Sequence, residues 1–231
     1  ETVKLLLSFE ANVNHFDRKG ISVVGVAAGR GFLNIVDLLF RNHANLIHTD
    51  HDGLVPMCIA ALQGHVHIVR YLCQNGVECV HVYDNHGRTP IYAASQRGNL
   101  AVVQELYHNG ADITIPDDIG RTPVCVAAFY NQIETLRFLC GLPECNVNHC
   151  DHHNRTALHS AASKGHDQII EILCQHGANV HIRDHYGRTP LFIASEFHHH
   201  QCIELLCKYG ASIDELDKNG CTPLCFAALS G

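Results

Sequence analysis

One spacing constrains this chain more than any other feature: an aspartate recurs at intervals of 33 or 34 residues along the sequence. The recurring residues are Asp17, Asp50, Asp84, Asp117, Asp151, Asp184 and Asp217. Three residues after each of them stands a glycine, except in the fifth case, where the residue is Asn154. An aspartate followed by glycine at this distance suits a type I turn. Self-similarity at such a period predicts an architecture that stacks copies of one small unit.

Two more columns follow each turn at fixed distances. The first is a Thr-Pro pair or its variant, as in Thr89-Pro90 and Thr189-Pro190. A threonine hydroxyl caps a helix N-terminus, and proline fits the first helical position because its missing N–H costs nothing there. The second column is a pair of small residues, such as Ala161-Ala162, that lets neighbouring helices approach closely. Each unit is therefore predicted to contain a short helix that begins at the threonine.

A second helix is predicted in each unit, because apolar pairs such as Ile169-Ile170 and Ile172-Leu173 recur at helical spacing. Glycine is expected to end both helices in a left-handed conformation. The glycines concerned are Gly31, Gly64, Gly98, Gly165 and Gly231 after the first helix, and Gly76, Gly110, Gly177 and Gly210 after the second. Asn131 and His198 replace glycine at two of the turns between the helices.

This pattern resembles the ankyrin repeat over the whole chain. The segment Thr156-Ala157-Leu158-His159-Ser160-Ala161-Ala162 matches the family signature most closely. The resemblance implies an all-α repeat solenoid of helix-turn-helix pairs joined by β-hairpin or loop fingers. In the family, the histidine of this signature ties neighbouring loops by hydrogen bonds. Elsewhere its column holds Gly25, Cys58, Tyr92, Cys125, Phe192 and Cys225, so the histidine ties are not expected there, whereas the fold still is.

The repeat register predicts a single array over 1–231. It consists of a half repeat at 1–16, full repeats at 17–49, 50–83, 84–116, 117–150, 151–183 and 184–216, and a half repeat at 217–231. One-residue insertions fall near Cys79-Val80 and near Pro143-Glu144, between a second helix and the finger after it. Repeat stacks need polar caps at both ends, and none is visible, so we expect a fragment of a longer protein.

Composition and charge exclude several function classes. The net charge of −7 argues against nucleic acid as a partner, because a basic surface is needed to neutralise phosphates. No apolar run approaches the roughly 18–20 residues that cross a bilayer, so no membrane span is expected. The sequence contains no phosphate loop, dinucleotide-binding, metalloprotease or nucleophile-elbow motif. We therefore predict no enzymatic activity, no catalytic residue and no cofactor.

The chain has twelve cysteines, which the repeat explains better than disulfides do. Cys73, Cys140, Cys174 and Cys207 share one column, and equivalent positions in stacked helices lie roughly 10 Å apart. A disulfide needs Cα atoms within about 7 Å. The cysteines are predicted to be reduced, and most of them to act as small core residues. This favours an intracellular, cytoplasmic location, with a nuclear one as an alternative, and makes the glycosylation sequon at Asn154 incidental.

Histidine is also abundant, with twenty residues. The finger 145–153 gathers Cys145, His149, Cys150, His152 and His153, which are ligand types for zinc. It has no Cys-x-x-Cys, and alternate residues of an extended chain point to opposite faces. We favour solvent-facing finger residues over a metal site, and predict no metal.

The ankyrin resemblance places the partner-binding face on the concave side, formed by finger tips and the first helices. The column after the turn glycine contains arginine in four successive repeats, which predicts a positive row suited to carboxylates or phosphates on a partner. Arginine is also common in this family column, so a structural role is the alternative. Phe129-Tyr130 lies beside this row and is the expected contact centre, unless Phe129 folds back onto the next repeat. The predicted site residues are Tyr83, Arg88, Arg97, Arg121, Phe129, Tyr130, His152, His153, Arg155, Lys164, Tyr186, Arg188 and Phe197.

Three functional hypotheses follow. The first is a monomeric, non-enzymatic scaffold that binds a peptide or protein, with acidic or phosphorylated groups as candidates for what it recognises. The second is a substrate-recruiting or regulatory arm of a larger ubiquitin ligase, kinase or ion channel. The third is a modification substrate, because some ankyrin repeats are hydroxylated at a finger asparagine that Asn14 and Asn148 match.

Overall fold

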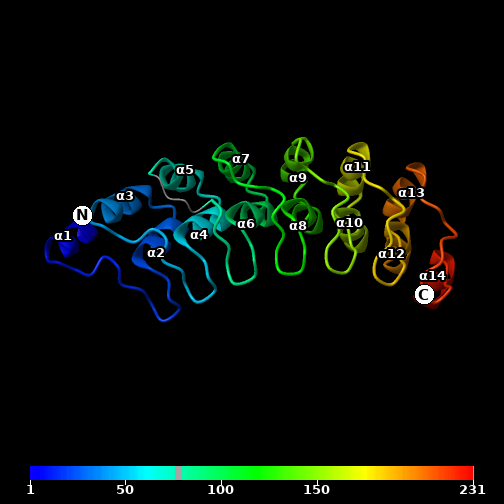
Figure 1. Ribbon diagram of the computed structural model, residues 1–231, viewed down its shortest axis with the longest axis horizontal. Helices are drawn as coiled ribbons and strands as arrows, with labels where there is room; N and C mark the ends of the chain where they lie inside the picture. The colour runs from blue at the N-terminus through cyan, green and yellow to red at the C-terminus, as the bar shows by residue number, and fades with distance from the viewer. Residues whose placement is uncertain (76–79, 231) are drawn as a thin grey trace. The chain divides into compact units, whose positions relative to one another are not determined.

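The structure is a computed structural model that describes residues 1–75 and 80–230, in which short helices alternate with loops (Figure 1). These residues confirm the predicted all-α repeat solenoid. The chain divides into two compact units, Glu1–Asp118 and Ile119–Gly231. The single-array arrangement stays a prediction. The expectations for Gly76, Cys79 and Gly231 lie outside the described residues.

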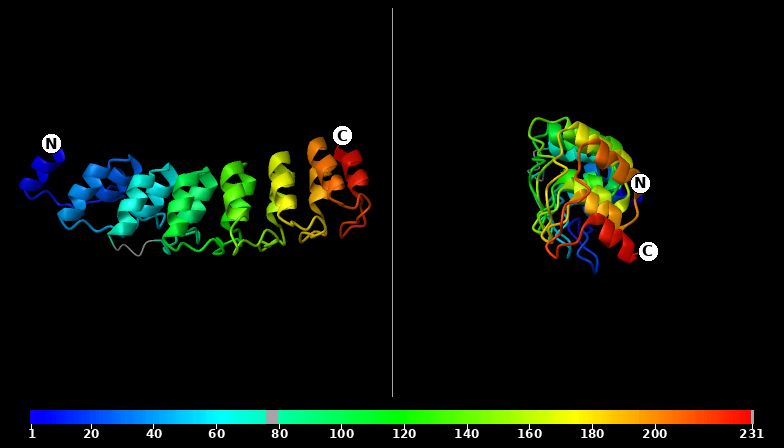
Figure 2. Two further views of the ribbon diagram at one scale, coloured as in Figure 1. Left: turned by 90° about the horizontal axis from the view of Figure 1, so that it is seen from above. Right: turned by 90° about the vertical axis from the view of Figure 1, so that its right-hand side faces the viewer.

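Unit 1 contains seven helices among its described residues: α1 Thr2–Ser8, α2 Val23–Gly29, α3 Leu33–Arg41, α4 Pro56–Gln63, α5 Val66–Gln74, α6 Pro90–Arg97 and α7 Leu100–His108. The first helices of successive repeats, α2, α4 and α6, pack side by side in one layer. The second helices, α3, α5 and α7, form the other layer. The finger loops project from one side of these layers (Figure 2).

Unit 2 repeats this arrangement over its described residues with α8 Pro123–Phe129, α9 Ile133–Cys140, α10 Ala157–Lys164, α11 Asp167–Gln175, α12 Pro190–Glu196, α13 His200–Lys208 and α14 Pro223–Ser230. The first helices α8, α10, α12 and α14 pack in sequence order, and α9, α11 and α13 form the second layer. Each first helix is joined to its second helix by a tight turn. The finger loops of this unit also leave the layers on one side (Figure 2).

Leucine holds the two layers together. One leucine of each second helix is at most 1% exposed, in the column Leu39, Leu72, Leu106, Leu139, Leu173 and Leu206. Full burial of such a side chain stabilises the fold by about 1.5–3 kcal/mol. The alanine pairs of α2, α4, α8 and α10 are almost completely buried as well. The core is therefore a periodic seam that runs between the helix layers within each unit.

The predicted hydroxyl caps are present at the start of most first helices. The hydroxyls of Thr89 and Thr189 accept the backbone N–H groups three residues later, at 3.3 Å in both cases. Ser22 does the same for Gly25 at 3.1 Å. Thr122 is different, because its hydroxyl lies 3.5 Å from the Cys125 sulfur and makes no cap bond to the backbone. The prediction of a hydroxyl cap was wrong there: the hydroxyl donates to the sulfur and accepts no backbone N–H.

The recurring aspartates organise the fingers in the way the sequence suggested. The N–H of Gly187 donates to the carbonyl of Asp184 at 2.9 Å and closes the turn. The Asp184 side-chain Oδ1 accepts the N–H groups of Tyr186 and Arg188. The same set of bonds recurs around Asp50, Asp84 and Asp151. The carboxylate and the carbonyl of one aspartate thus accept three backbone N–H groups in each of these fingers.

Successive finger tips are joined by one backbone hydrogen bond each. In unit 1, the N–H groups of His51, Asn85 and Asp118 donate to carbonyls of the preceding finger at 3.0 Å. In unit 2, the N–H groups of His152, His185 and Lys218 do so at 2.8–3.0 Å. The fingers are loops, and the described residues contain one isolated β-bridge, between Phe16 and Ser22. This row of bonds spaces the tips of each unit at a constant interval.

Asn131 and His198 adopt positive φ angles of 58° and 56°, so both take the left-handed place that glycine has in other repeats. Of the cysteines, Cys58 and Cys125 are buried as expected, but Cys207 and Cys225 are exposed. The expectation that the cysteines act as core residues was therefore wrong for these two.

Thr135 is a polar exception in the core, and its replacement by valine should stabilise the chain. The residue is 1% exposed, and its hydroxyl has no hydrogen-bond partner among the described residues. The equivalent positions hold Ile68, Val102 and Ile169, which are all buried. A buried hydroxyl without a partner costs about 1–3 kcal/mol. We expect Thr135→Val to raise the midpoint of urea denaturation, while Thr122→Val lowers it because that hydroxyl is engaged. A midpoint below that of the wild type for Thr135→Val would contradict this account.

Candidate functional site

A groove of about 400 Å³ lies in unit 2, between the finger loops and the first helices α8, α10 and α12. It gathers seven of the residues predicted from the sequence: Arg121, Phe129, His153, Arg155, Lys164, Arg188 and Phe197. Ile119, Asp151, Ser160, Ser163, Ile193 and Glu196 complete the wall together with His159. The groove thus combines four cationic side chains with two aromatic rings.

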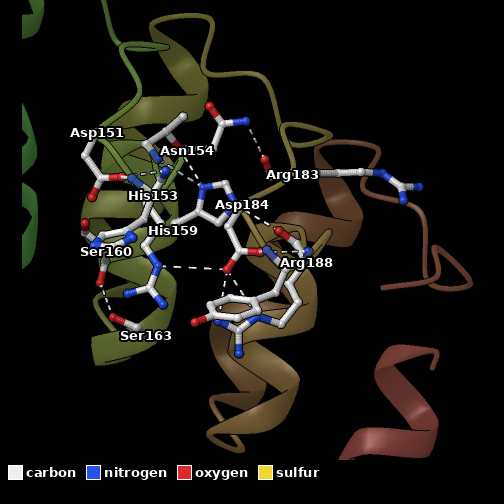
Figure 3. A network of polar contacts seen from close by, with 12 residues as sticks. Asp151, His153, Asn154, His159, Ser160, Ser163, Arg183, Asp184 and Arg188 are labelled. Carbon is white, nitrogen blue, oxygen red and sulfur yellow. Dashed lines mark hydrogen bonds and ion pairs between the residues drawn. The ribbon is translucent and has the colours of Figure 1, made fainter. Parts of the chain in front are cut away.

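The carboxylate of Asp184 lies beside two of these arginines, Arg155 and Arg188 (Figure 3). Its side chain is 1% exposed, and its Oδ2 accepts Nε and Nη2 of Arg188 at 3.1 and 2.9 Å. Nε of Arg155, from the preceding repeat, lies 3.9 Å from the same oxygen. Burial alone would raise the pKa of Asp184, but the backbone and guanidinium hydrogen bonds of Arg188 outweigh it and lower the pKa. The carboxylate therefore stays charged and positions arginines from two repeats.

The two arginines differ in what they offer a partner. Arg188 is largely occupied, because its Nη1 also donates to Glu196 at 2.9 Å and its guanidinium lies 4.9 Å from the centre of the Tyr186 ring. The side chain of Arg155 is 42% exposed, although its Nε is buried beside Asp184 and makes no hydrogen bond within the described part of the chain. Arg155 is thus better placed than Arg188 to receive an anionic group in the groove.

Lys164 and Phe129 form a second contact across two repeats. The ammonium group of Lys164 lies 4.7 Å from the centre of the Phe129 ring, which is half-buried. Tyr130 packs edge-on against Phe129, with ring centres 5.0 Å apart, and is itself exposed. Phe129 therefore contacts the following repeat, which was the alternative to a role as contact centre. Its side chain also contributes to the groove wall. Phe197, which directly follows α12, is 51% exposed, and its ring presents an aromatic surface in the groove.

His159 supports the groove from below. Its Nδ1 accepts the Thr156 N–H at 3.2 Å, and its Nε2 lies 3.1 Å from the Arg188 carbonyl oxygen. This pair of bonds requires the neutral ring with the proton on Nε2. Burial lowers the pKa of His159 to about 4. The predicted loop tie is present here, and it links α10 to the next finger. In unit 1, the Tyr92 hydroxyl makes the corresponding tie to Asp117 at 2.7 Å.

The other predicted residues lie outside the groove. His152 and Tyr186 are exposed on finger tips of unit 2. Tyr83, Arg88 and Arg97 belong to unit 1, where Arg88 donates to Asp84 at 2.7 Å and repeats the Asp184–Arg188 pair. Tyr83 and Arg97 are exposed.

Sequence reasoning missed Asp184 and Glu196 as parts of the site. Asp184 was interpreted only as a turn residue, and Glu196 was given no role. The signal that could have found them was their spacing of four and eight residues from Arg188.

Asn14 and Asn148 make matching contacts. Their Oδ1 atoms accept the backbone N–H groups of Asn45 and Asn179, at 2.7 Å in both cases. Each asparagine therefore ties its finger to the following repeat. Hydroxylation of these residues stays a prediction.

Two further properties concern ligands and membranes. Within residues 1–75 and 80–230, no three His, Cys, Asp or Glu side chains cluster closely enough to hold a metal ion. In the finger 145–153, Nε2 of His149 contacts the Gly120 carbonyl at 2.9 Å, and the Cys150 sulfur contacts the Asn148 carbonyl at 3.6 Å. None of the described helices combines the length and apolar character of a membrane span.

Comparison with known proteins agrees with this architecture. The family model "Ankyrin repeats (3 copies)" matches residues 24–117, 91–184 and 178–231. Transient receptor potential cation channel subfamily A member 1 of Homo sapiens is 30% identical over 184 residues, which cover 77% of this chain and 16% of the channel.

Two shorter matches come from other protein classes. Ankyrin repeat and SOCS box protein 3 of Bos taurus is 35% identical over 88 residues, which are 37% of this chain and 17% of that protein. E3 ubiquitin-protein ligase XBAT33 of Arabidopsis thaliana is 36% identical over 98 residues, 41% of this chain and 19% of the ligase. The chain thus spans less than a fifth of the length of these relatives. The family model covers most of the sequence, and the chain belongs to the ankyrin-repeat family.

Proposed function

We propose that this chain is a protein-binding module, and that the groove of unit 2 holds an extended segment of a partner with an acidic or phosphorylated group beside an apolar side chain. The observation that carries this proposal is the pairing of the half-exposed Arg155 side chain with the exposed Phe197 ring in one groove. Guanidinium groups bind carboxylates and phosphates through directed hydrogen bonds, and aromatic rings supply apolar contact area.

Charge supports an acidic rather than a basic partner. Arg121, Arg155 and Lys164 line the groove, whereas the Glu196 carboxylate is already paired with Arg188. Asp151 is engaged through Oδ1 with two backbone N–H groups of its own finger. A local cationic surface on a chain of net charge −7 would favour this face over others for an anionic segment.

A displayed random peptide library tests the proposal directly. We expect selection on the wild-type chain to enrich peptides with Asp or Glu near an apolar residue, and kinase treatment of the library shows whether phosphate is preferred. Lys164→Glu and Phe197→Ala should each weaken binding of the selected peptides, by about thirtyfold for a residue that acts as a hot spot.

Lys208→Glu is the matched control, because it makes the same charge change in unit 2 at an exposed residue of α13, in the other helix layer. Its affinity should equal that of the wild type. The proposal fails if selected peptides lack acidic groups, or if all three variants bind equally well while remaining folded by circular dichroism.

A second candidate function is that of a recruiting or regulatory arm in a larger protein. The relatives that favour it are a cation channel and an E3 ubiquitin-protein ligase, of which this chain matches only a small part. Both candidates use the same binding surface. The complete reading frame separates them, because an arm requires a ligase, kinase or channel domain elsewhere in the protein.

A further inference from the structure

The end of α9 differs from the ends of the other second helices. After α3, α7, α11 and α13, a residue with φ between 64° and 87° ends the helix: His43, Gly110, Gly177 or Gly210. After α9, none of the residues 141–145 has a positive φ, and Gly141 has φ −76° and ψ −9°. Two successive turns follow, closed by the N–H of Leu142 on the Leu139 carbonyl and by the N–H of Cys145 on the Leu142 carbonyl. The sequence cause is the one-residue insertion near Pro143-Glu144.

This altered turn places a second cysteine next to Cys140. The position of Cys145, six residues before the finger aspartate, is alanine in four other repeats: Ala44, Ala111, Ala178 and Ala211. In those repeats the alanine N–H bonds directly to the leucine of the second helix. In repeat 117–150 the chain folds back instead, and the thiols of Cys140 and Cys145 share a hydrogen bond. The following repeat contains one cysteine at this place, Cys174, and the preceding repeat has Tyr107 there, whereas this repeat contains a pair.

The two thiols have unequal environments. Cys140 is 8% exposed at the end of α9, whereas Cys145 is half-buried in the loop and more open to solvent. The hydrogen bond from Cys140 lowers the pKa of Cys145, and the same bond together with burial raises the pKa of Cys140. Thiolate character and exposure control reactivity toward oxidants. Both differences favour Cys145 over Cys140 as the more reactive thiol.

We propose that Cys140 and Cys145 are a reversible oxidation site that forms an intramolecular disulfide on exposure to a hydroperoxide. The Cys145 thiolate attacks one peroxide oxygen, the O–O bond breaks, and hydroxide leaves and is protonated to water, which makes Cys145 a sulfenic acid. The Cys140 sulfur then attacks the Cys145 sulfur, and the S–O bond breaks. The Cys140 proton converts the departing hydroxide to a second water. Two thiols lose two electrons in total, and the peroxide gains them.

Alkylation mapping after treatment with hydrogen peroxide tests this site. The oxidised chain is treated with N-ethylmaleimide, digested without reduction and analysed by mass spectrometry. In the wild type, we expect Cys140 and Cys145 to escape alkylation and their peptide to be lighter by two hydrogens. Cys174, which occupies the column of Cys140 but has Ala178 in place of a second thiol, should be alkylated fully. Reduction before alkylation should restore labelling of both cysteines.

Two variants identify the partner cysteines. Cys145→Ala introduces the residue that other repeats have at this position, and it should restore alkylation of Cys140 after oxidation. Cys150→Ala removes the next cysteine of the same peptide and should leave the disulfide in place. Full alkylation of Cys140 in the oxidised wild type overturns the proposal, as does loss of the disulfide in Cys150→Ala with its retention in Cys145→Ala.

Discussion

Asp184→Ala is expected to lower the free energy of unfolding by about 3–5 kcal/mol, the cost of removing one partner from a buried ion pair. The carboxylate accepts two backbone N–H groups and two guanidinium donors of Arg188, and all four lose their acceptor in the variant. The Arg188 side chain is only 15% exposed, so water replaces these bonds poorly. Urea denaturation followed by circular dichroism measures the change.

Two comparisons make this expectation specific. Asp184→Asn keeps an oxygen for the backbone N–H groups and should lose less stability than the alanine variant. Asp214→Ala removes an exposed carboxylate of the following finger and should shift stability by no more than about 0.5 kcal/mol. If Asp184→Ala proves as stable as Asp214→Ala, the carboxylate does not organise the groove.

Acidification is expected to weaken the fold through His159. The folded pKa of His159, about 4, lies below the ordinary value, so the unfolded chain binds the proton more readily. The stabilisation from the neutral ring is therefore complete above the unfolded pKa of about 6.5 and is lost as the pH falls toward 4. The shift corresponds to about 3 kcal/mol. Protonation of Nδ1 also removes the acceptor for the Thr156 N–H.

The chain has nineteen other histidines, so the contribution of His159 to the pH dependence of stability is measured by comparing variants with the wild type. Denaturation curves from about pH 7 to about pH 4 should fall more steeply for the wild type than for His159→Gln, which does not titrate. His153→Gln replaces an exposed imidazole of the same groove, and its curve should run parallel to that of the wild type. Equal slopes for His159→Gln and the wild type would show that burial does not suppress protonation of His159.

Much of the fold could be predicted because the determining residues act locally. Asp184, Gly187 and Thr189 each specify a turn or a cap within a few residues, and the structure has those bonds. The left-handed turn at His198 was predictable for the same reason. The side-chain contact of Thr122 was not predictable in this way, because its hydroxyl donates to the Cys125 sulfur, which the capping pattern does not consider.

The groove was only partly predictable, and the arginines show why. Arg155 and Arg188 both stand four residues after a finger aspartate. Arg188 folds back onto its own aspartate, Asp184, whereas Nε of Arg155 faces the same Asp184 from the preceding repeat. Glu196 on α12 holds the Arg188 guanidinium further in place. Identical local spacing thus leads to different partners, because contacts between repeats decide where a long side chain settles. The expected row of equivalent arginines is in fact a set of unequal ones.

The bonds that join successive finger tips have a consequence for how such chains change over evolutionary time. Each bond connects a backbone N–H to a carbonyl of the adjacent finger, as between His185 and His153 or Lys218 and Tyr186, and requires no particular side chain. Stacked repeats interact with their immediate neighbours. Duplication of one 33-residue segment within a gene therefore adds a finger whose main-chain partners already exist on both sides. Recognition of a new ligand can then arise by substitutions on the added surface, while the older surface keeps its ligand.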